Sequence, residues 1–160
     1  MGGWSDFFVA EVGASAALAG LVIVAISINL SRIVSFPWLP GRAAETLVAP
    51  TGVLVVSSTM LVPGQSPGQR AIELIATGAA MWLMPVIIQF RTLGKQKGVP
   101  RRSLVTRFTL TQLSSLPVIA TGAMLLAGRP DPIVWMVPGI VASLIATVIN
   151  AWVLLVEIVR

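Results

Sequence analysis

The sequence predicts an all-α membrane protein with five transmembrane helices. Of its 160 residues, 56% are hydrophobic and only 11% are charged, and the mean hydropathy is +0.91. A soluble domain carries roughly 25% charged residues, so a surface this poor in charge is not stable in water. Because one span takes about 20 residues, five spans take about 100 and leave no room for a separate soluble domain. We therefore expect a single transmembrane domain over residues 1–160.

Turn residues separate the apolar runs and set the limits of each span. The expected spans are residues 7–33, 43–62, 70–90, 104–127 and 133–159. The first ends before the turn-rich segment 36–41. Pro40 and Glu45 suit the start of the second span, and Pro63-Gly64 ends it. The third precedes the basic segment 91–102. Segment 128–132, with a Gly and two Pro residues, separates the fourth span from the fifth. Kinks are expected at Pro50 and Pro117.

The basic residues indicate the orientation of the spans, because loops rich in Lys and Arg stay in the cytoplasm. If the N-terminus lies outside, only Arg70 and Arg129 of the eleven basic residues fall outside. The cytoplasmic side then holds Arg32, Arg42, Arg91, Lys95, Lys97, Arg101, Arg102, Arg107 and Arg160. We therefore expect an N-out, C-in topology. The loop Arg91–Arg102 would contact anionic lipid headgroups, and the net charge of +5 does not indicate a nucleic-acid partner.

The side-chain inventory argues against an enzyme. The sequence contains no His, no Cys and no Tyr. Zinc, iron–sulfur, haem and copper sites of the usual kinds need His or Cys ligands, and a Ser–His triad needs a His. We expect no catalytic residues, no metal site and no cofactor.

The first span carries a narrow face of small residues. Gly13, Ala17, Gly20, Val24, Ser27 and Ser31 follow one another at steps of three and four residues. Close backbone approach is a main driving force for helix association in lipid, so another helix should lie against this face. It could belong to the same chain or to a neighbouring subunit around a symmetry axis.

A short motif occurs twice, in the third and fourth spans. Segment 75–79 reads Ile-Ala-Thr-Gly-Ala, and segment 119–123 repeats it. The two spans run in opposite directions, so both copies fall in the outer half of the bilayer. We expect Thr77-Gly78 and Thr121-Gly122 to meet at a close crossing, although chance repetition is a rival explanation in so Ala- and Gly-rich a chain.

Polar side chains within the spans are candidates for a functional site, because an unpaired polar group in hydrocarbon costs several kcal/mol. Gln112 and Asn150 are expected within ~8 Å of the bilayer centre, at nearly equal depth on adjacent helices. Ser143 and Thr147 share a face with Asn150. These groups either form hydrogen bonds between helices or line a wet cavity open to the cytoplasm.

Two acids lie near the outer edge of the hydrocarbon. Glu11 and Glu73 each have a hydroxyl four residues further on, from Ser15 and Thr77. Asn29 shares a face with Glu11, about five turns along the helix. In an oligomer, Glu11 or Glu73 would form an acidic ring that attracts cations. The alternative is simpler, since acids are favoured at helix N-termini and can reach water there.

Several segments resemble one known family. They are segments 13–21, 25–30, 41–47 and 62–65. The family comprises small multi-pass bacterial proteins, common in actinobacteria, and some members carry the label "modulator of FtsH protease". The resemblance lies mainly in residues 13–65, and beyond about residue 70 it rests on hydropathy alone. It implies a bacterial inner-membrane setting and a membrane-protease partner, but no catalytic or ligand-binding residues.

Two functions are compatible with these patterns. The first is a homo-oligomeric channel or pore for small solutes, with cations favoured by the outer acids. In it Glu11 and Glu73 concentrate cations at the outer mouth, while Gln112 and Asn150 replace hydration deeper in. The second is an accessory or regulatory subunit that binds another inner-membrane protein and conducts nothing. A small transporter would need an unwound helix, which the prolines of the spans permit.

Overall fold

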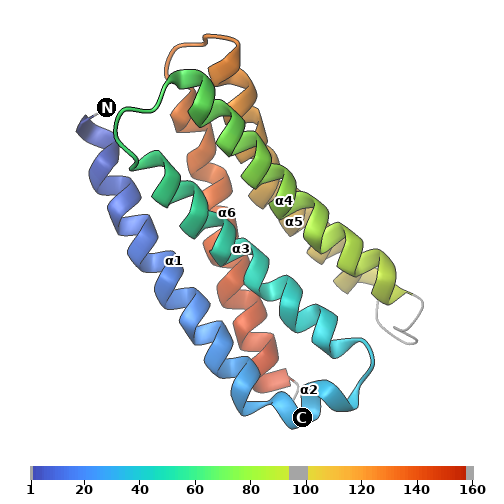
Figure 1. Ribbon diagram of the computed structural model, residues 1–160. Helices are drawn as coiled ribbons and strands as arrows, with labels where there is room; N and C mark the ends of the chain where they lie inside the picture. Colours follow the sequence, from blue (N-terminus) through green and yellow to red (C-terminus); the bar gives the residue numbers. More distant parts are fainter. Residues whose placement is uncertain (1, 94–100, 158–160) are drawn as a thin grey trace.

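The computed structural model describes residues 2–93 and 101–157, and within these ranges the secondary structure is entirely helical (Figure 1). The elements are α1 (Gly2–Ile28), α2 (Leu30–Ser35), α3 (Leu39–Met60), α4 (Pro67–Leu93), α5 (Arg101–Leu126), the 3₁₀ turn η1 (Pro132–Met136), α6 (Val137–Trp152) and the π-helical turn η2 (Val153–Glu157). Five segments are long and apolar enough to cross a membrane, namely Gly3–Ile28, Leu39–Met60, Pro67–Thr92, Leu104–Leu126 and Pro132–Leu155. The prediction of an all-α, multi-pass membrane protein is confirmed at this level.

The first expected span, 7–33, is not one continuous helix. α1 ends at Ile28, and Asn29 separates it from the short α2. The Asn29 side-chain amide donates to the carbonyls of Ala25 (3.1 Å) and Leu154 (3.2 Å). Asparagine readily bonds to nearby backbone in this way, which makes it a frequent residue at helix ends. Here the bond to Leu154 also ties the break in α1 to η2.

Several helices begin earlier than the hydropathy predicts, and for α3 and α4 local chemistry explains the early start. α3 begins at Leu39, with Pro40 in its first turn, where a missing N–H costs no helical hydrogen bond. α4 begins at Pro67, next to a reciprocal cap. The Ser66 backbone N–H donates to Gln69 Oε1 (2.9 Å), and the Gln69 backbone N–H donates to Ser66 Oγ (3.2 Å). This is a capping box of the Ser-x-x-Gln type.

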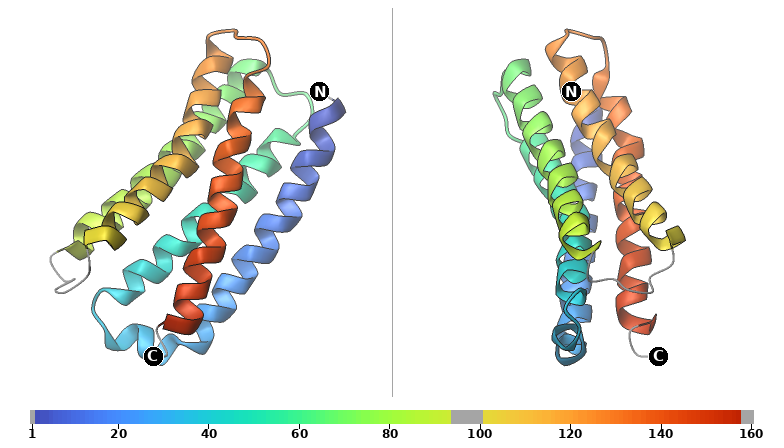
Figure 2. Two further views of the ribbon diagram at one scale, coloured as in Figure 1. Left: turned by 180° about the vertical axis from the view of Figure 1, so that it is seen from behind. Right: turned by 90° about the vertical axis from the view of Figure 1, so that its right-hand side faces the viewer.

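The helices pack in two layers, best seen from the side (Figure 2). α1, α3 and α4 form one layer, with α3 in the middle, and α5 and α6 form the other. The N-terminus lies at the same end of the bundle as the α3–α4 and α5–η1 connections, and we call this the N-terminal end. The opposite end, which we call the C-terminal end, holds α2 and the described end of η2.

The largest apolar core draws on all five spans. Its buried members are Phe8, Val53, Val56, Met60, Leu74, Val118, Met136 and Ile140. These residues come from the parts of the helices nearer the N-terminal end. Smaller clusters, Val22 with Ala151 and Leu154, and Ile33 with Leu39 and Ala43, lie nearer the other end.

α4 and α5 cross closely at the repeated motif. A Cβ atom added to Gly78 would lie 2.7 Å from Ile119 Cγ1, and one added to Gly122 would lie 2.7 Å from Ile75 Cγ1 and 2.9 Å from the Ala71 carbonyl oxygen. Each glycine therefore faces the isoleucine that begins the other copy of the motif. The expected close crossing is confirmed, and its reciprocity makes chance repetition a poor explanation.

Candidate functional site

α1 has one packed face and one open face. Phe8, Ser15, Val22 and Ala25 are buried against the rest of the bundle. The residues of the predicted small face that lie in α1 are all exposed, and we call them the α1 stripe: Gly13, Ala17, Gly20, Val24 and Ser27. A Cβ atom added to Gly13 or Gly20 would have nothing within 4 Å. Of the two alternatives for this stripe, contact with a helix of the same chain is therefore wrong for the part of the chain that the structure describes. Ser31, beyond the break, is exposed as well.

Glu11 does not lie on the stripe. At about 100° per residue, Gly13 and Gly20 lie about 160° and 140° around the helix from Ser15, whereas Glu11 lies only about 40° from it. Glu11 is thus on the packed side of α1, and its Oε2 is buried without a hydrogen-bond partner in the described part of the chain. The Ser15 hydroxyl donates to the backbone carbonyls of Glu11 (2.6 Å) and Val12 (3.2 Å). The acid and the stripe therefore cannot both face the same neighbouring subunit.

Glu73 is held by a residue that sequence reasoning missed. Gln65, in the turn before α4, donates from Nε2 to both carboxylate oxygens of Glu73, at 2.8 and 2.7 Å. Thr77 is half-buried and lines a groove of about 380 Å³ between α3 and α4 that is almost wholly apolar. Glu73 and Thr77 lie four residues apart in the continuous helix α4, as expected, and the printed hydrogen bonds of the Glu73 carboxylate come from Gln65.

The predicted polar residues of α5 and α6 have separate roles. Gln112 Oε1 accepts a hydrogen bond from Trp82 Nε1 (3.0 Å), which links α4 to α5. Ser143 and Thr147 are fully buried, and each donates to a carbonyl of α6 itself at 2.8 Å. Asn150 instead lines a cavity to which Gln112 does not contribute. The structure therefore does not bring the two amides together.

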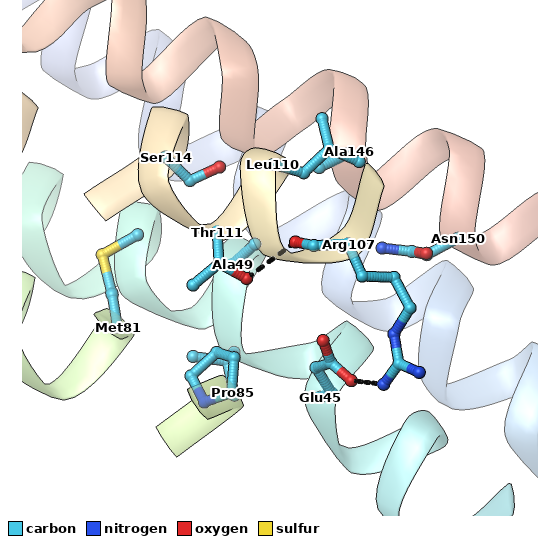
Figure 3. A pocket seen from close by; sticks show the side chains of 11 residues that line it. Glu45, Ala49, Met81, Pro85, Arg107, Leu110, Thr111, Ser114, Ala146 and Asn150 are labelled. Carbon is cyan, nitrogen blue, oxygen red and sulfur yellow. Dashed lines mark hydrogen bonds and ion pairs between the residues drawn. The ribbon is translucent and has the colours of Figure 1, made fainter. Parts of the chain in front are cut away.

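A polar cluster joins α3, α4 and α5 in the half of the bundle nearer the C-terminal end. Figure 3 shows three of its members, Glu45, Arg107 and Thr111. Arg107 of α5 forms an ion pair with Glu45 of α3, and their side chains are only 9% and 11% exposed. Gln89 of α4 donates to Glu45 Oε1 (2.6 Å) and to Thr111 Oγ1 (3.4 Å). The Thr111 hydroxyl donates in turn to the Arg107 carbonyl (3.0 Å). We call Glu45, Gln89, Arg107 and Thr111 the polar junction.

The junction was not predicted from the sequence, because its two charges were assigned separate roles there. Arg107 counted as a cytoplasmic basic residue and Glu45 as a helix-start acid, and they are 62 residues apart. Each nevertheless lies inside an expected span, 43–62 or 104–127. The pair could have been predicted from one feature of the sequence: an acid and a base lie within expected spans, toward the same end of the bundle. Charged residues at such depth usually pair with one another.

Beside the junction lies a cavity of about 40 Å³ where α3, α4, α5 and α6 meet. We call it the junction cavity. Its lining residues are Glu45, Val48, Ala49, Met81, Pro85, Arg107, Leu110, Thr111, Ser114, Ala146 and Asn150. In Figure 3 the Asn150 side chain points from α6 toward Arg107.

The fold and the site define a small polytopic helical membrane protein with an ion pair inside its bundle and an open face on its first helix. In the described ranges, no group of three or more acidic, His or Cys side chains is placed to hold a metal ion. Comparison with protein-family models, with curated proteins and with solved structures finds no match to this chain.

The predicted lipid contact of loop Arg91–Arg102 falls largely outside the described residues. α4 extends to Leu93 and α5 begins at Arg101, so the connection is shorter than the sequence suggested. Arg91 is exposed at the end of α4.

Proposed function

We propose that this chain is an accessory subunit that binds another inner-membrane protein laterally through the α1 stripe. The observation that carries the proposal is that this stripe points away from every described helix of the chain. Small residues let two backbones approach closely, which favours helix association in lipid. The resemblance to the family labelled "modulator of FtsH protease" makes a membrane protease the first partner to test.

The proposal includes an N-out, C-in orientation in a bacterial inner membrane. In this orientation the C-terminal end of the bundle faces the cytoplasm. Three basic residues lie in the parts of the helices that reach this end: Arg32 in α2, Arg42 in the first turns of α3 and Arg91 in the last turn of α4. The orientation therefore agrees with retention of basic residues in the cytoplasm. The proposal includes no catalytic step, since the chain lacks His and Cys.

A homo-oligomeric channel is the second candidate. The observation that favours it is the junction cavity, which places Glu45, Arg107 and Asn150 around one small space inside the spans. The predicted outer acids support it less directly, because Glu73 is clamped by Gln65 and Glu11 lies away from the stripe. Passage of small cationic solutes would then require several copies joined through α1.

Cross-linking at single cysteines tests both candidates, because the native chain has none. Gly20→Cys places a thiol on the stripe, and Leu21→Cys places one on the neighbouring exposed position, about 100° around the helix. We expect oxidative or bifunctional cross-linking in native membranes to join Gly20→Cys to a different membrane protein and to leave Leu21→Cys largely unlinked. Mass spectrometry identifies the product.

Each result separates the candidates. A product made only of two copies of this chain would overturn the accessory proposal and support the oligomer, and ion flux through proteoliposomes would then test conduction. No product at Gly20→Cys, or equal products at both positions, would overturn a role for the stripe. A Gly20→Leu variant that keeps its helicity but loses the partner in co-purification would confirm that the stripe itself makes the contact.

A further inference from the structure

The junction cavity contains two polar groups without a hydrogen-bond partner among the described residues. Within residues 2–93 and 101–157, the Asn150 amide and the Ser114 hydroxyl both line the cavity, and neither has a hydrogen-bond partner. Ser114 is 6% exposed. The other hydroxyl of the cavity wall, from Thr111, is engaged, since it donates to the Arg107 carbonyl at 3.0 Å. Asn150 and Ser114 therefore stand out from their neighbours.

These unpaired groups lie next to charges. The Glu45 carboxylate uses Oε2 for Arg107 and Oε1 for Gln89. The Arg107 guanidinium has five N–H donors. Its hydrogen bond to the Glu45 carboxylate uses only some of them. The cavity wall thus offers guanidinium, amide and hydroxyl groups within one small space.

The volume of the junction cavity suits a few water molecules better than a larger ligand. A buried water needs roughly 10–15 Å³ of such space and typically makes about three hydrogen bonds. A cavity of about 40 Å³ therefore has room for about two or three waters. A purely apolar cavity of this size would stay empty, but this one has polar groups on three of its four helices, α3, α5 and α6.

We propose that the junction cavity is an intramembrane water-binding site, in which a few waters bridge Asn150 and Ser114 to the Glu45–Arg107 ion pair. The waters satisfy the two unpaired groups, each of which would otherwise add a desolvation penalty. They also lower the cost of holding two charges within the spans, because a buried ion pair is stable only when its remaining polar atoms are hydrogen-bonded. This inference does not depend on the proposed partner binding.

Infrared spectroscopy of single thiols tests the proposal without adding bulk to the cavity. Ser114→Cys places the only thiol of the chain in the cavity wall. Ser143→Cys is the matched control, since Ser143 is also a buried serine but bonds within α6. We expect the S–H group at position 114 to convert to S–D in D₂O faster than that at position 143, by about tenfold or more. Equal rates at the two positions, whether both slow or both fast, would overturn the proposal.

Two filling variants give a second, independent measurement. Ala146 lines the cavity on its apolar side, so Ala146→Leu fills the space without removing a polar group. Added to Ser114→Cys, it should slow the exchange to the rate seen at position 143. Asn150→Leu should do the same while also removing the amide. If one of the two fails to fold, the other still decides, and unchanged fast exchange in a folded, filled protein would overturn the proposal.

Discussion

α1 and the α4–α5 pair use the same small residues in opposite ways. In α4 and α5, Gly78 and Gly122 each lie where a Cβ would meet the facing helix at less than 3.0 Å. In α1, Gly13 and Gly20 have nothing within 4 Å. The first pair makes a contact within the chain, and the second leaves a surface available to another protein. Small residues in a membrane helix thus indicate a close approach without indicating which helix makes it.

A second difference concerns polar groups. α5 is joined to α3 by an ion pair and to α4 by the Trp82–Gln112 hydrogen bond. α1 has a polar link near its C-terminal break, where Asn29 bonds to Leu154. The α4–α5 pair is thus held by both glycine packing and polar bonds, whereas the α1 stripe is exposed.

The largest effect is expected at the polar junction. Arg107→Leu leaves the Glu45 carboxylate buried without its charged partner, and such a loss typically costs about 3–5 kcal/mol. The double variant Glu45→Leu/Arg107→Leu should cost much less, because no isolated charge remains. Unfolding of the purified protein in mixed micelles measures both. A single variant as stable as the wild type would show that the pair does not hold α5 in place.

A smaller effect on stability is expected from substitutions at the glycines. These substitutions test the difference between the α4–α5 pair and α1 directly. Gly122→Ala should destabilise the protein by about 1–3 kcal/mol, because its new methyl group meets the backbone of α4. Gly20→Ala should be neutral or stabilise the isolated chain by up to about 1 kcal/mol, because alanine favours the helix and meets nothing. The same unfolding measurement applies to both. Equal losses for the two variants would contradict the distinction between the regions.

The smallest effect is expected at the Trp82–Gln112 bond. Trp82→Phe keeps an aromatic ring but removes the indole donor, and interhelical hydrogen bonds of this kind are worth about 0.6 kcal/mol on average. We therefore expect a loss well below that of Gly122→Ala. A loss as large as that of Gly122→Ala would mean that polar bonding, and not glycine packing, holds α4 against α5.

Much of the fold was predictable because it depends on local composition. Five apolar runs predicted five long helices, and the repeated Ile-Ala-Thr-Gly-Ala segment predicted the α4–α5 crossing. The errors lay at helix ends, where side-chain bonds decide the boundary. Asn29 stops α1 early, and the Ser66–Gln69 cap starts α4 early. A hydropathy profile detects neither of these side-chain interactions.

The candidate site was less predictable, because it depends on how the helices are rotated relative to one another. The sequence correctly indicated that Asn150 is a polar residue within a span, but it paired Asn150 with Gln112. In the structure Gln112 faces Trp82, and Asn150 faces the cavity beside Arg107. Depth along a helix follows from counting residues, whereas direction around it is fixed by packing.

The sequence by itself determined the apolar composition, the five runs long enough to span a membrane and the lack of His and Cys. These properties follow from residue types and from the length of each apolar run, whatever the helices pack against. Only the tertiary structure decided that Glu45 meets Arg107 and that the α1 stripe faces outward. Both depend on contacts between helices distant in the chain, and the rotation that makes those contacts is set by the packing of all five helices together.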